Sequence, residues 1–210
     1  MLRILIADDH PIVRRGLRQT IDETPDMLVV DEASNGREVL SKVRAASYDV
    51  VLLDISMPGR SGVDILKELK SERPGLPVLI LTIHSEEQYA VRVLRAGASG
   101  YLTKESAPDE LVAAIRKVSM GGRYVTSSLA ERLASELGTS DEELPHKALS
   151  DREYQVMRMV ASGKTVTQIA EELSLSVKTV STYRSRILEK MKMNNNAEIT
   201  YYAIKNRLVD

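Results

Sequence analysis

The stretch Met1-Leu-Arg-Ile-Leu-Ile-Ala-Asp8-Asp9 opens the chain with a short apolar run, Leu2–Ala7, that two aspartates follow. Similar short runs follow at residues 27–30, 50–53, 78–81 and 100–102. Between the runs, apolar residues recur at helical spacing: Ile12, Val13, Leu17 and Ile21; Val39, Leu40 and Val43; Val63, Leu66 and Leu69; Tyr89, Val93 and Leu94; Leu111, Val112, Ile115 and Val118. Apolar strands that alternate with amphipathic helices are typical of a parallel sheet with helices on both faces. We therefore predict a doubly wound, five-stranded α/β domain over residues 1–120.

The composition excludes several classes of protein. The 210 residues are 43% hydrophobic and 28% charged, which is typical of a globular protein and not of a disordered or fibrous one. Cysteine is absent, so disulfides, thiolate metal sites and cysteine nucleophiles are excluded. No segment approaches the ~20 consecutive apolar residues of a membrane span, and the two early aspartates interrupt any signal-peptide core. We expect a cytoplasmic protein without a membrane partner.

The net charge of −1 hides a difference between the two parts of the chain. Residues 1–146 carry a balance of −5, and residues 147–210 carry a balance of +4. Opposite signs indicate two domains with different partners, and a basic second part is compatible with nucleic acid. Uneven surface charge alone is the simpler explanation, and charge by itself favours it.

Five polar residues follow the predicted strands. Asp8 and Asp9 follow the first strand, Asp54 the third, Thr82 the fourth and Lys104 the fifth. Ligands of doubly wound sheets gather at the carboxyl ends of the strands. Three carboxylates that repel one another suit a hard cation such as Mg²⁺, and Asp54, alone on its strand, is a candidate nucleophile for aspartyl-phosphate chemistry. Lys104 and Thr82 are candidates to hold phosphoryl oxygens.

Each of these residues also has a structural explanation. Asp8 and Asp9 precede Pro11 and are candidate caps of the first helix, and Lys104 is a candidate solvated surface residue. The coincidence of five such residues at one edge of one sheet favours a phosphoryl-transfer site.

Four motifs resemble the receiver domain of two-component response regulators: Asp8-Asp9-His10-Pro11, Asp54-Ile-Ser-Met57-Pro58-Gly59, Thr82 and Gly100-Tyr101-Leu-Thr-Lys104. The resemblance covers residues 1–120 and implies a flavodoxin-like fold. It implies that a partner histidine kinase phosphorylates Asp54. It also implies that Asp9, Asp54 and the backbone carbonyl of Ser56 bind Mg²⁺ directly, with Asp8 acting through water.

The resemblance further implies a switch in which Thr82 moves toward the phosphoryl group, Tyr101 reorients and Lys104 pairs with the phosphate. Two positions depart from the family pattern. Ile83 follows Thr82, where many receivers have a small residue, and this puts phosphoryl accessibility and lifetime in doubt. Glu105 follows Lys104, where many receivers have proline, often with a cis bond, so no slow isomerisation is expected.

Residues 121–146 have the pattern of a linker. Leu129, Leu133 and Leu137 predict a short amphipathic helix, followed by a polar, flexible connection over 138–145. Packing on a domain is the favoured role for these leucines, because the helix is too short for a coiled coil.

The last part, residues 147–210, predicts four helices. Ser150 with Glu153, and Thr165 with Gln168, are capping boxes, and a tight turn at 174–176 joins the second helix to a longer third helix, which Ser176 can cap. This spacing matches a helix-turn-helix unit, although a small bundle with a solvated face would show it too. Opposite the expected apolar stripe of Val180, Ile187, Leu188 and Met191, the third helix presents candidate DNA-binding residues: Lys178, Thr179, Ser181, Thr182, Ser185 and Arg186.

Leu149-Ser-Asp-Arg-Glu153, Gln168-Ile-Ala170, Leu175-Ser176 and Lys178-Thr179-Val180 resemble the LuxR-type (NarL/FixJ-type) DNA-binding domain. The resemblance implies that residues 177–191 form the recognition helix. Tyr183 and Ser174 replace the His and Gly that are common in the family. The resemblance also offers Tyr201, Tyr202 and Ile204 as dimer contacts; buried core is the competing explanation, and for Ile204 the favoured one.

The leading hypothesis is a DNA-binding transcriptional regulator that Mg²⁺-dependent phosphorylation of Asp54 switches by promoting homodimerisation, release of the recognition helix, or both. The receiver would catalyse only its own phosphoryl transfer and slow dephosphorylation, so the protein would not be an enzyme in the ordinary sense. A metal-dependent phosphohydrolase would need a leaving-group pocket and a general acid, for which we find no segment. A constitutive DNA-binding regulator, with the receiver as a dimerisation module, remains the alternative.

Overall fold

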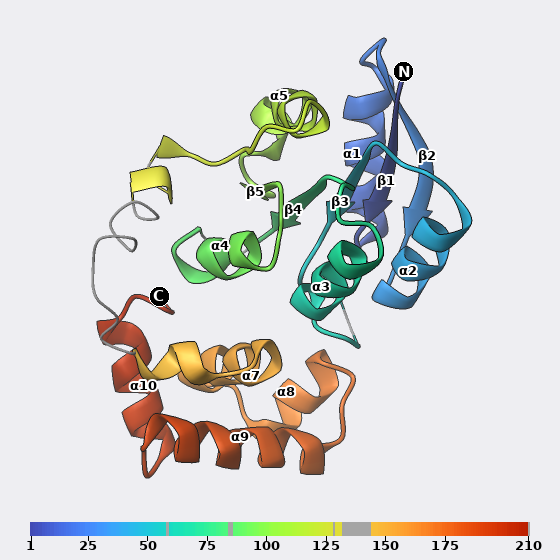
Figure 1. Cartoon of the computed structure of the whole chain (residues 1–210). Coiled ribbons are helices and arrows are strands. Elements are labelled where there is room, and N and C mark those ends of the chain that lie inside the picture. Colours follow the sequence, from blue (N-terminus) through green and yellow to red (C-terminus); the bar gives the residue numbers. More distant parts are fainter. Residues whose placement is uncertain (58, 84–85, 128, 132–143, 210) are drawn as a thin grey trace. The chain divides into compact units, whose positions relative to one another are not determined.

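The computed structural model describes residues 1–57, 59–83, 86–127, 129–131 and 144–209 (Figure 1). The chain divides into two compact units, Met1–Arg132 and Leu133–Asp210. Within the described parts of both units, the helices are too short or too polar to cross a membrane. Leu129 is buried, whereas Leu133, Leu137 and most of the polar connection lie outside the described residues.

The first unit alternates strands with helices. Its strands are β1 (Leu2–Ala7), β2 (Met27–Ala33), β3 (Val50–Leu53), β4 (Val78–Thr82) and β5 (Gly100–Thr103). Its helices are α1 (Pro11–Asp22), α2 (Gly36–Ala45), α3 (Gly62–Glu72), α4 (Glu86–Arg95) and α5 (Ala107–Ser119). The strands pair in parallel in the order β2-β1-β3-β4-β5, which confirms the predicted doubly wound sheet. The order reverses between β1 and β3, and ligands of such sheets bind at that point.

The helices cover both faces of the sheet (Figure 1). On one face, α1 and α5 pack against a continuous core that includes Ile4, Leu52 and Leu79. Successive residues of a strand point to opposite faces, and the alternate residues Leu5 and Leu53 are buried as well. Burial on both faces explains why the strands are apolar throughout.

The buried stripe of α1 is narrower than the sequence predicts. Leu17 and Ile21 are buried and Val13 packs against the core, but Ile12 is 86% exposed. Val13, Leu17 and Ile21 are spaced by four residues and form one line along the helix, whereas Ile12 lies one residue, or about 100°, away from it.

The chain after α5 returns to the edge of the sheet beside β5. Tyr124 N–H donates to the Ser99 carbonyl at 3.0 Å, and Tyr101 N–H donates to the Tyr124 carbonyl at 3.1 Å. The Tyr124 hydroxyl donates to Glu110 Oε2 at 2.5 Å. Glycine is required at position 100, because a Cβ there would lie 2.7 Å from the Tyr124 carbonyl oxygen. The start of the expected linker is therefore attached to the sheet.

The second unit is helical. It contains a 3-10 turn, η1 (Pro145–Ala148), and the helices α7 (Asp151–Ala161), α8 (Val166–Glu172), α9 (Val177–Met191) and α10 (Asn196–Lys205). Both predicted capping boxes are present, at Ser150 with Glu153 and at Thr165 with Gln168. Helix α7 ends before Gly163, whose φ of 82° is readily adopted by glycine.

Two side chains of the second unit are more exposed than expected. Ile204 is 56% exposed, so its predicted place in the core is wrong. The buried residues of α10, Ile199 and Ala203, are four apart, and Ile204 lies one residue away from their line. In α9, Val180, Ile187 and Met191 are buried as predicted, whereas Leu188 is only half-buried.

Candidate functional site

The carboxyl ends of the central strands bring the predicted acidic residues together. Asp8 and Asp9 follow the last residue of β1, and Asp54 follows the last residue of β3. Asp54 N–H donates to the Ala7 carbonyl at 2.8 Å, which aligns the two strand ends. Asp8 and Asp54 are each only 1% exposed, although carboxylates are rarely fully buried without partners.

Lys104 is the cation that compensates these buried carboxylates. Its Nζ lies 2.6 Å from Asp8 Oδ2 and donates a hydrogen bond to Asp54 Oδ2 at 2.7 Å. The contact with Asp8 is an ion pair whose geometry does not meet the criteria for a hydrogen bond. Ser56 N–H donates to Asp54 Oδ1 at 2.8 Å, so both oxygens of Asp54 accept hydrogen bonds.

Burial and charge shift the acid–base properties of this pair in a consistent way. Burial raises the pKa of Asp54, and the Lys104 ammonium offsets part of that rise. Burial opposes the charge of Lys104, but Asp54 and Asp8 outweigh it and raise the pKa of Lys104. At neutral pH Lys104 is therefore cationic. Burial removes the Asp54 carboxylate from water, and this desolvation disfavours its charged form.

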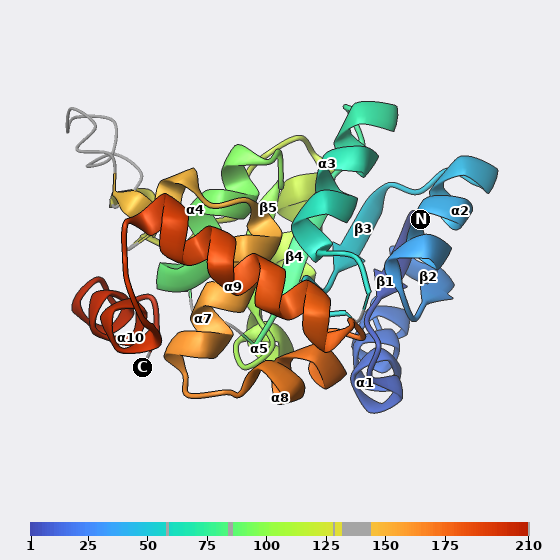
Figure 2. The same cartoon turned by 90° about the horizontal axis from the view of Figure 1, so that it is seen from below.

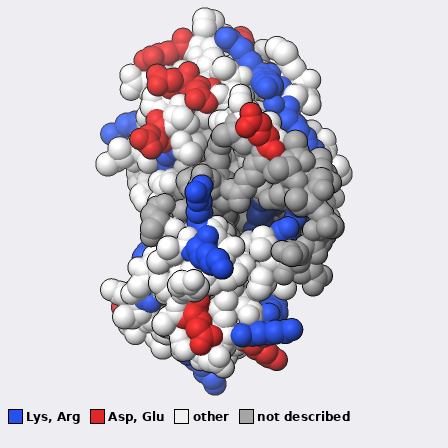
Figure 3. Space-filling model, turned by 90° about the vertical axis from the view of Figure 1, so that its left-hand side faces the viewer, with Lys and Arg blue, Asp and Glu red and all other residues white. Residues whose placement is uncertain are grey.

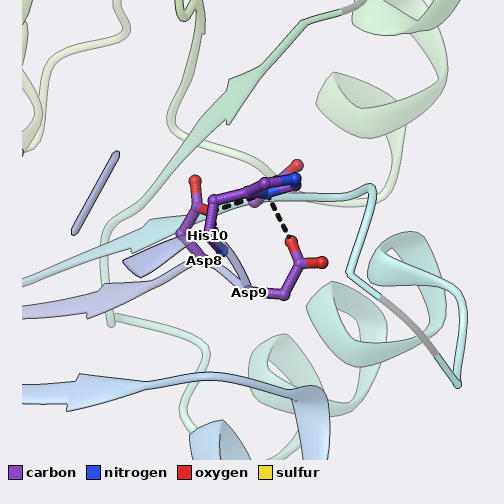
Figure 4. A group of neighbouring side chains, drawn as sticks. Asp8, Asp9 and His10 are labelled. Atoms are coloured by element: carbon purple, nitrogen blue, oxygen red, sulfur yellow. Dashed lines mark hydrogen bonds and ion pairs between the residues drawn. The ribbon is translucent and has the colours of Figure 1, made fainter. Parts of the chain in front are cut away.

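A second group of contacts links Asp8 and Asp9 to His10 (Figure 4). His10 Nδ1 lies 2.9 Å from Asp9 Oδ1 and 3.3 Å from Asp8 Oδ1, and His10 N–H donates to Asp8 Oδ1 at 2.8 Å. One ligand atom from each of Asp8, Asp9, His10 and Asp54 lies within 4.8 Å of the others. Asp9 Oδ1 is buried and accepts no hydrogen bond from any described residue. This buried oxygen, in contact with His10 Nδ1 and in a cluster of three carboxylates, fits a divalent cation.

The expected caps of α1 are not observed. The N-cap residue of this helix is His10, and its side chain makes no capping hydrogen bond. The Asp8 carboxylate accepts from the His10 backbone, and the Asp8 carbonyl accepts from Arg14 Nη1 at 2.6 Å. Sequence analysis assigned no role to His10 or Arg14, and only the position of His10 beside two aspartates would have suggested one.

The loop after β3 turns sharply to clear the site. Gly59 has a φ of 90°, and a Cβ at Gly62 would lie 2.3 Å from Ile55 Cα. Met57 in this loop is buried. The Ser56 backbone N–H contacts Asp54 and so anchors the loop to the carboxylate.

Thr82 and Tyr101 lie on the two strands beside the site. Thr82 ends β4 and is fully buried, and its carbonyl accepts from Lys104 N–H at 2.8 Å. Tyr101 on β5 is also fully buried, opposite Ile80. Ile83, one of the two departures from the family pattern, is 72% exposed.

The second unit has the elements of a helix-turn-helix. Ser176 caps α9 by accepting from Thr179 N–H at 3.1 Å, and Ser174 occupies the turn with a φ of 53°. This left-handed backbone explains why the family commonly has glycine there. Arg152 Nη2 donates to the Leu173 carbonyl at 3.3 Å, and Lys190 Nζ contacts Glu153 Oε2 at 2.6 Å.

Most of the predicted residues of helix α9, which is labelled in Figure 2, are exposed. Exposed side chains are Lys178, Ser181, Thr182, Ser185 and Arg186, whereas Thr179 is half-buried and contacts Ser176 Oγ. The Thr182 and Ser185 hydroxyls donate to carbonyls one turn earlier, at 2.9 and 3.1 Å. Val177 at the start of the helix is also exposed, a feature that the sequence analysis missed.

Figure 3 shows one face of the molecule, on which Lys and Arg side chains lie among Asp and Glu side chains. On α9, Lys178 and Arg186 are exposed cations. On α10, Tyr201 is exposed, and the Tyr202 hydroxyl lies 2.7 Å from His146 Nδ1 of η1.

Known proteins match both units. Residues 4–116 match the response regulator receiver domain, and residues 147–203 match the luxR family of bacterial regulatory proteins. The response regulator UvrY of Escherichia coli strain K12 is 39% identical over 209 residues, which are 99% of this chain and 96% of that protein. The response regulator GacA of Pseudomonas aeruginosa is 36% identical over 211 residues, which cover 100% of this chain and 99% of that one.

Solved structures agree. RcsB from Salmonella enterica serovar Typhimurium, bound to promoter rprA in the presence of the phosphomimetic BeF3-, has a TM-score of 0.65 and 28% identity. The match covers 96% of this chain and 98% of that one. A LuxR-family response regulator from Aurantimonas sp. SI85-9A1 has a TM-score of 0.61 and 36% identity, over 66% of this chain and 99% of that one. The chain therefore belongs to the two-component response regulators that join a receiver domain to a LuxR-type DNA-binding domain and regulate transcription.

Proposed function

We propose that Asp54 accepts a phosphoryl group from a partner histidine kinase, and that this modification controls DNA binding by the second unit. In this proposal residues 1–120 are the receiver, 121–146 the linker and 147–210 the DNA-binding domain. The observation that carries it is the contact of Lys104 with Asp54, because this cation is already placed where phosphoryl oxygens would need one.

The site supports an in-line transfer to Asp54. A carboxylate oxygen of Asp54 forms the new P–O bond while the P–N bond of the kinase phosphohistidine breaks. The imidazole leaves with the electron pair of that bond and takes up a proton. Ser56 N–H orients the Asp54 carboxylate, and Lys104 Nζ would balance the charge of the phosphoryl oxygens.

Three carboxylates and one carbonyl would hold Mg²⁺ in this site. Asp9, Asp54 and the Ser56 carbonyl would bind it directly and Asp8 through water, and the close approach of the ligand atoms of Asp8, Asp9 and Asp54 supports this assignment. When bound, Mg²⁺ supplies positive charge to the phosphoryl oxygens. Lys104, which contacts Asp8 and Asp54, would then turn from the carboxylates to the phosphoryl group.

Thr82 and Tyr101 would transmit the change. Phosphorylation adds about −1.5 to −2 charges at neutral pH, and the Thr82 hydroxyl and Lys104 would approach them. The backbone bond from Lys104 to Thr82 couples these two residues, and Tyr101 would reorient on the neighbouring strand. A ligand of this kind shifts a pre-existing equilibrium between two states of the switch elements.

In the active state, α9 would enter the major groove, with Lys178 and Arg186 on phosphates and Ser181, Thr182, Ser185 and Thr179 toward base edges. Solved RcsB–DNA complexes, and one with two RcsB dimers on two DNAs, support DNA binding by homodimers. The exposure of Tyr201 and Ile204 supports α10 as a dimer contact. The receiver itself would catalyse only its own phosphoryl transfer and slow dephosphorylation.

The intact mass of the full chain, after incubation with a small phosphodonor, tests the first step. We expect a gain of one phosphate in wild type with Mg²⁺ and in the control Asp26→Asn, which removes an exposed carboxylate paired with Arg116. Asp54→Asn, or chelation of Mg²⁺, should abolish the gain. A phosphate that persists in Asp54→Asn would contradict the assignment of the acceptor.

DNA affinity and sedimentation of the phosphorylated and unmodified forms test the second step. We expect the phosphorylated form to bind DNA more tightly than the unmodified form and to sediment as a dimer. If Asp54→Asn dimerises and binds DNA as tightly as the phosphorylated wild type, the protein is a constitutive regulator and the coupling proposed here is wrong.

A further inference from the structure

His10 belongs to the acidic cluster, but the proposed function gives it no role. Its ring nitrogen Nδ1 converges with the oxygens of Asp8 and Asp9, as Figure 4 shows. We propose that His10 Nδ1 is a ligand when a late first-row transition-metal ion such as Co²⁺ is bound, so that the site prefers such ions over Mg²⁺. This inference rests on the proposed divalent-cation site formed by the same carboxylates.

The spacing of the ligand atoms supports this role. Bonds of about 2.1 Å place two ligands at neighbouring corners of an octahedron about 3 Å apart. His10 Nδ1 lies 2.9 Å from Asp9 Oδ1, the direct carboxylate ligand, which matches this spacing. It lies 3.3 Å from Asp8 Oδ1, which would face the ion through water. Asp9 Oδ1 is buried and accepts no hydrogen bond of regular geometry from the described residues, and an ion bound between Asp9 Oδ1 and His10 Nδ1 would contact both atoms.

The backbone around His10 fixes the position of the ring. Pro11 follows, which restricts His10 to extended conformations, and its observed φ and ψ are −90° and 110°. His10 N–H donates to Asp8 Oδ1 at 2.8 Å, and its carbonyl accepts from Arg14 N–H at 3.1 Å. The side chain is 64% exposed, so it is not held there by core packing, and an ion can reach it from solvent.

The chemistry of imidazole determines which ions bind more tightly when His10 is a ligand. Mg²⁺ is bound through oxygen and keeps several waters, whereas imidazole suits later first-row ions, whose affinity for such sites rises along the series. A competing explanation is that a protonated His10 only neutralises the carboxylates. The two explanations predict opposite changes in ion affinity when His10 is removed, because a ligand strengthens ion binding and a counter-charge weakens it.

Isothermal titration of the full chain with CoCl₂ and with MgCl₂, at about pH 8 where an ordinary imidazole is neutral, separates them. We expect His10→Ala to weaken Co²⁺ binding by about tenfold or more, while Mg²⁺ affinity changes by less than about twofold. The visible absorption of bound Co²⁺ should also change. His146→Ala, which removes a histidine of the other unit, should leave both affinities and the spectrum as in wild type.

The remaining outcomes overturn the inference. If His10→Ala binds both ions more tightly, His10 acts as a counter-charge. If the variant matches wild type for both ions, His10 has no role at a site that nonetheless binds cations. Failure of wild type to bind either ion would contradict both this inference and the proposed function. Asp9→Asn should weaken the binding of both ions if the carboxylates form the site, so it identifies the case in which only the inference about His10 fails. Thermal unfolding without metal verifies that each variant is folded.

Discussion

Lys104 Nζ lies 2.7 Å from Asp54 Oδ2 and 2.6 Å from Asp8 Oδ2, so one ammonium compensates two buried carboxylates that follow two other strands. The same cation is the proposed partner of the phosphoryl group on Asp54. Modification of Asp54 would therefore redistribute a charge that already stabilises the fold, which couples the chemistry of the site to the packing of β1, β3 and β5.

Replacement of Lys104 by Met should destabilise the protein without Mg²⁺ by about 3 kcal/mol, because it leaves buried carboxylates without their cation. Millimolar Mg²⁺ should restore much of the lost stability by binding the same carboxylates. Urea unfolding with and without Mg²⁺ measures both effects. Lys42→Met, which breaks the partly exposed pair with Asp31, should cost at most about 1 kcal/mol and gain nothing from Mg²⁺. Equal losses in the two variants would contradict this account of Lys104.

Asp54→Asn should stabilise the metal-free protein at neutral pH by about 1 kcal/mol, because it removes a buried charge while Lys104 keeps Asp8 as its partner. The folded pKa of Asp54 is raised above the ordinary 3.8, mainly by burial. The folded state therefore holds a proton that the unfolded state has lost, and wild-type stability falls as pH rises from about 3.8 through the folded pKa. The variant should lack this fall. Thermal unfolding of both proteins between about pH 4 and pH 8 measures it, and parallel profiles would refute the expectation.

Gly100→Ala should destabilise the first unit by about 1–3 kcal/mol, because the new Cβ would lie 2.7 Å from the Tyr124 carbonyl oxygen and 2.9 Å from Leu79 Cδ1. Hydrogen exchange of the Tyr101 amide, which donates to Tyr124, should become faster. Gly75→Ala is the matched control, since no atom lies within 4 Å of its added Cβ. A Gly100→Ala protein as stable as this control would show that the chain does not return to β5 as described.

Ser174→Gly should stabilise the second unit by about 0.5–1 kcal/mol, because the left-handed backbone at φ 53° strains a residue with a Cβ. Ser162→Gly, at a C-cap with a φ of −78°, lacks this benefit and should be neutral or destabilising. Differential scanning calorimetry compares the two variants. A lower unfolding temperature for Ser174→Gly would mean that the serine side chain stabilises the turn.

Lys178→Ala should weaken DNA binding for all sequences and reduce the slope of log K against log salt by about 0.9, if Lys178 contacts one phosphate. Thr182→Ala should leave that slope unchanged, because its side chain is neutral. Lys67→Ala, an exposed lysine on α3 of the first unit, is the matched control and should change neither affinity nor slope. Fluorescence anisotropy at several salt concentrations gives these values. An unchanged slope for Lys178→Ala would remove Lys178 from the interface.

Much of the fold follows from the sequence, because short-range patterns decide it. The runs at 2–7 and 50–53 became β1 and β3 with the predicted bounds, and the box of Ser150 with Glu153 begins α7 as expected. The meeting of Asp8, Asp54 and Lys104 was also predictable, because parallel strands of one sheet end at one edge. These features depend on interactions within a few residues or on a general rule of topology.

Tertiary structure alone decided the rest. Ile12 and Ile204 belong to apolar stripes in the sequence, yet they are exposed, because the width of the stripe that a helix buries depends on the surface against it. The return of Tyr124 to β5, and the convergence of His10 Nδ1 with two carboxylates, require particular positions of backbone and ring that no local pattern encodes. Sequence by itself determined the elements, their order and the edge that holds the acidic site. Packing determined which side chains at that edge touch. Contact between two side chains is made or lost when their distance changes by a few tenths of an ångström, and the elements that carry them are far apart in the sequence.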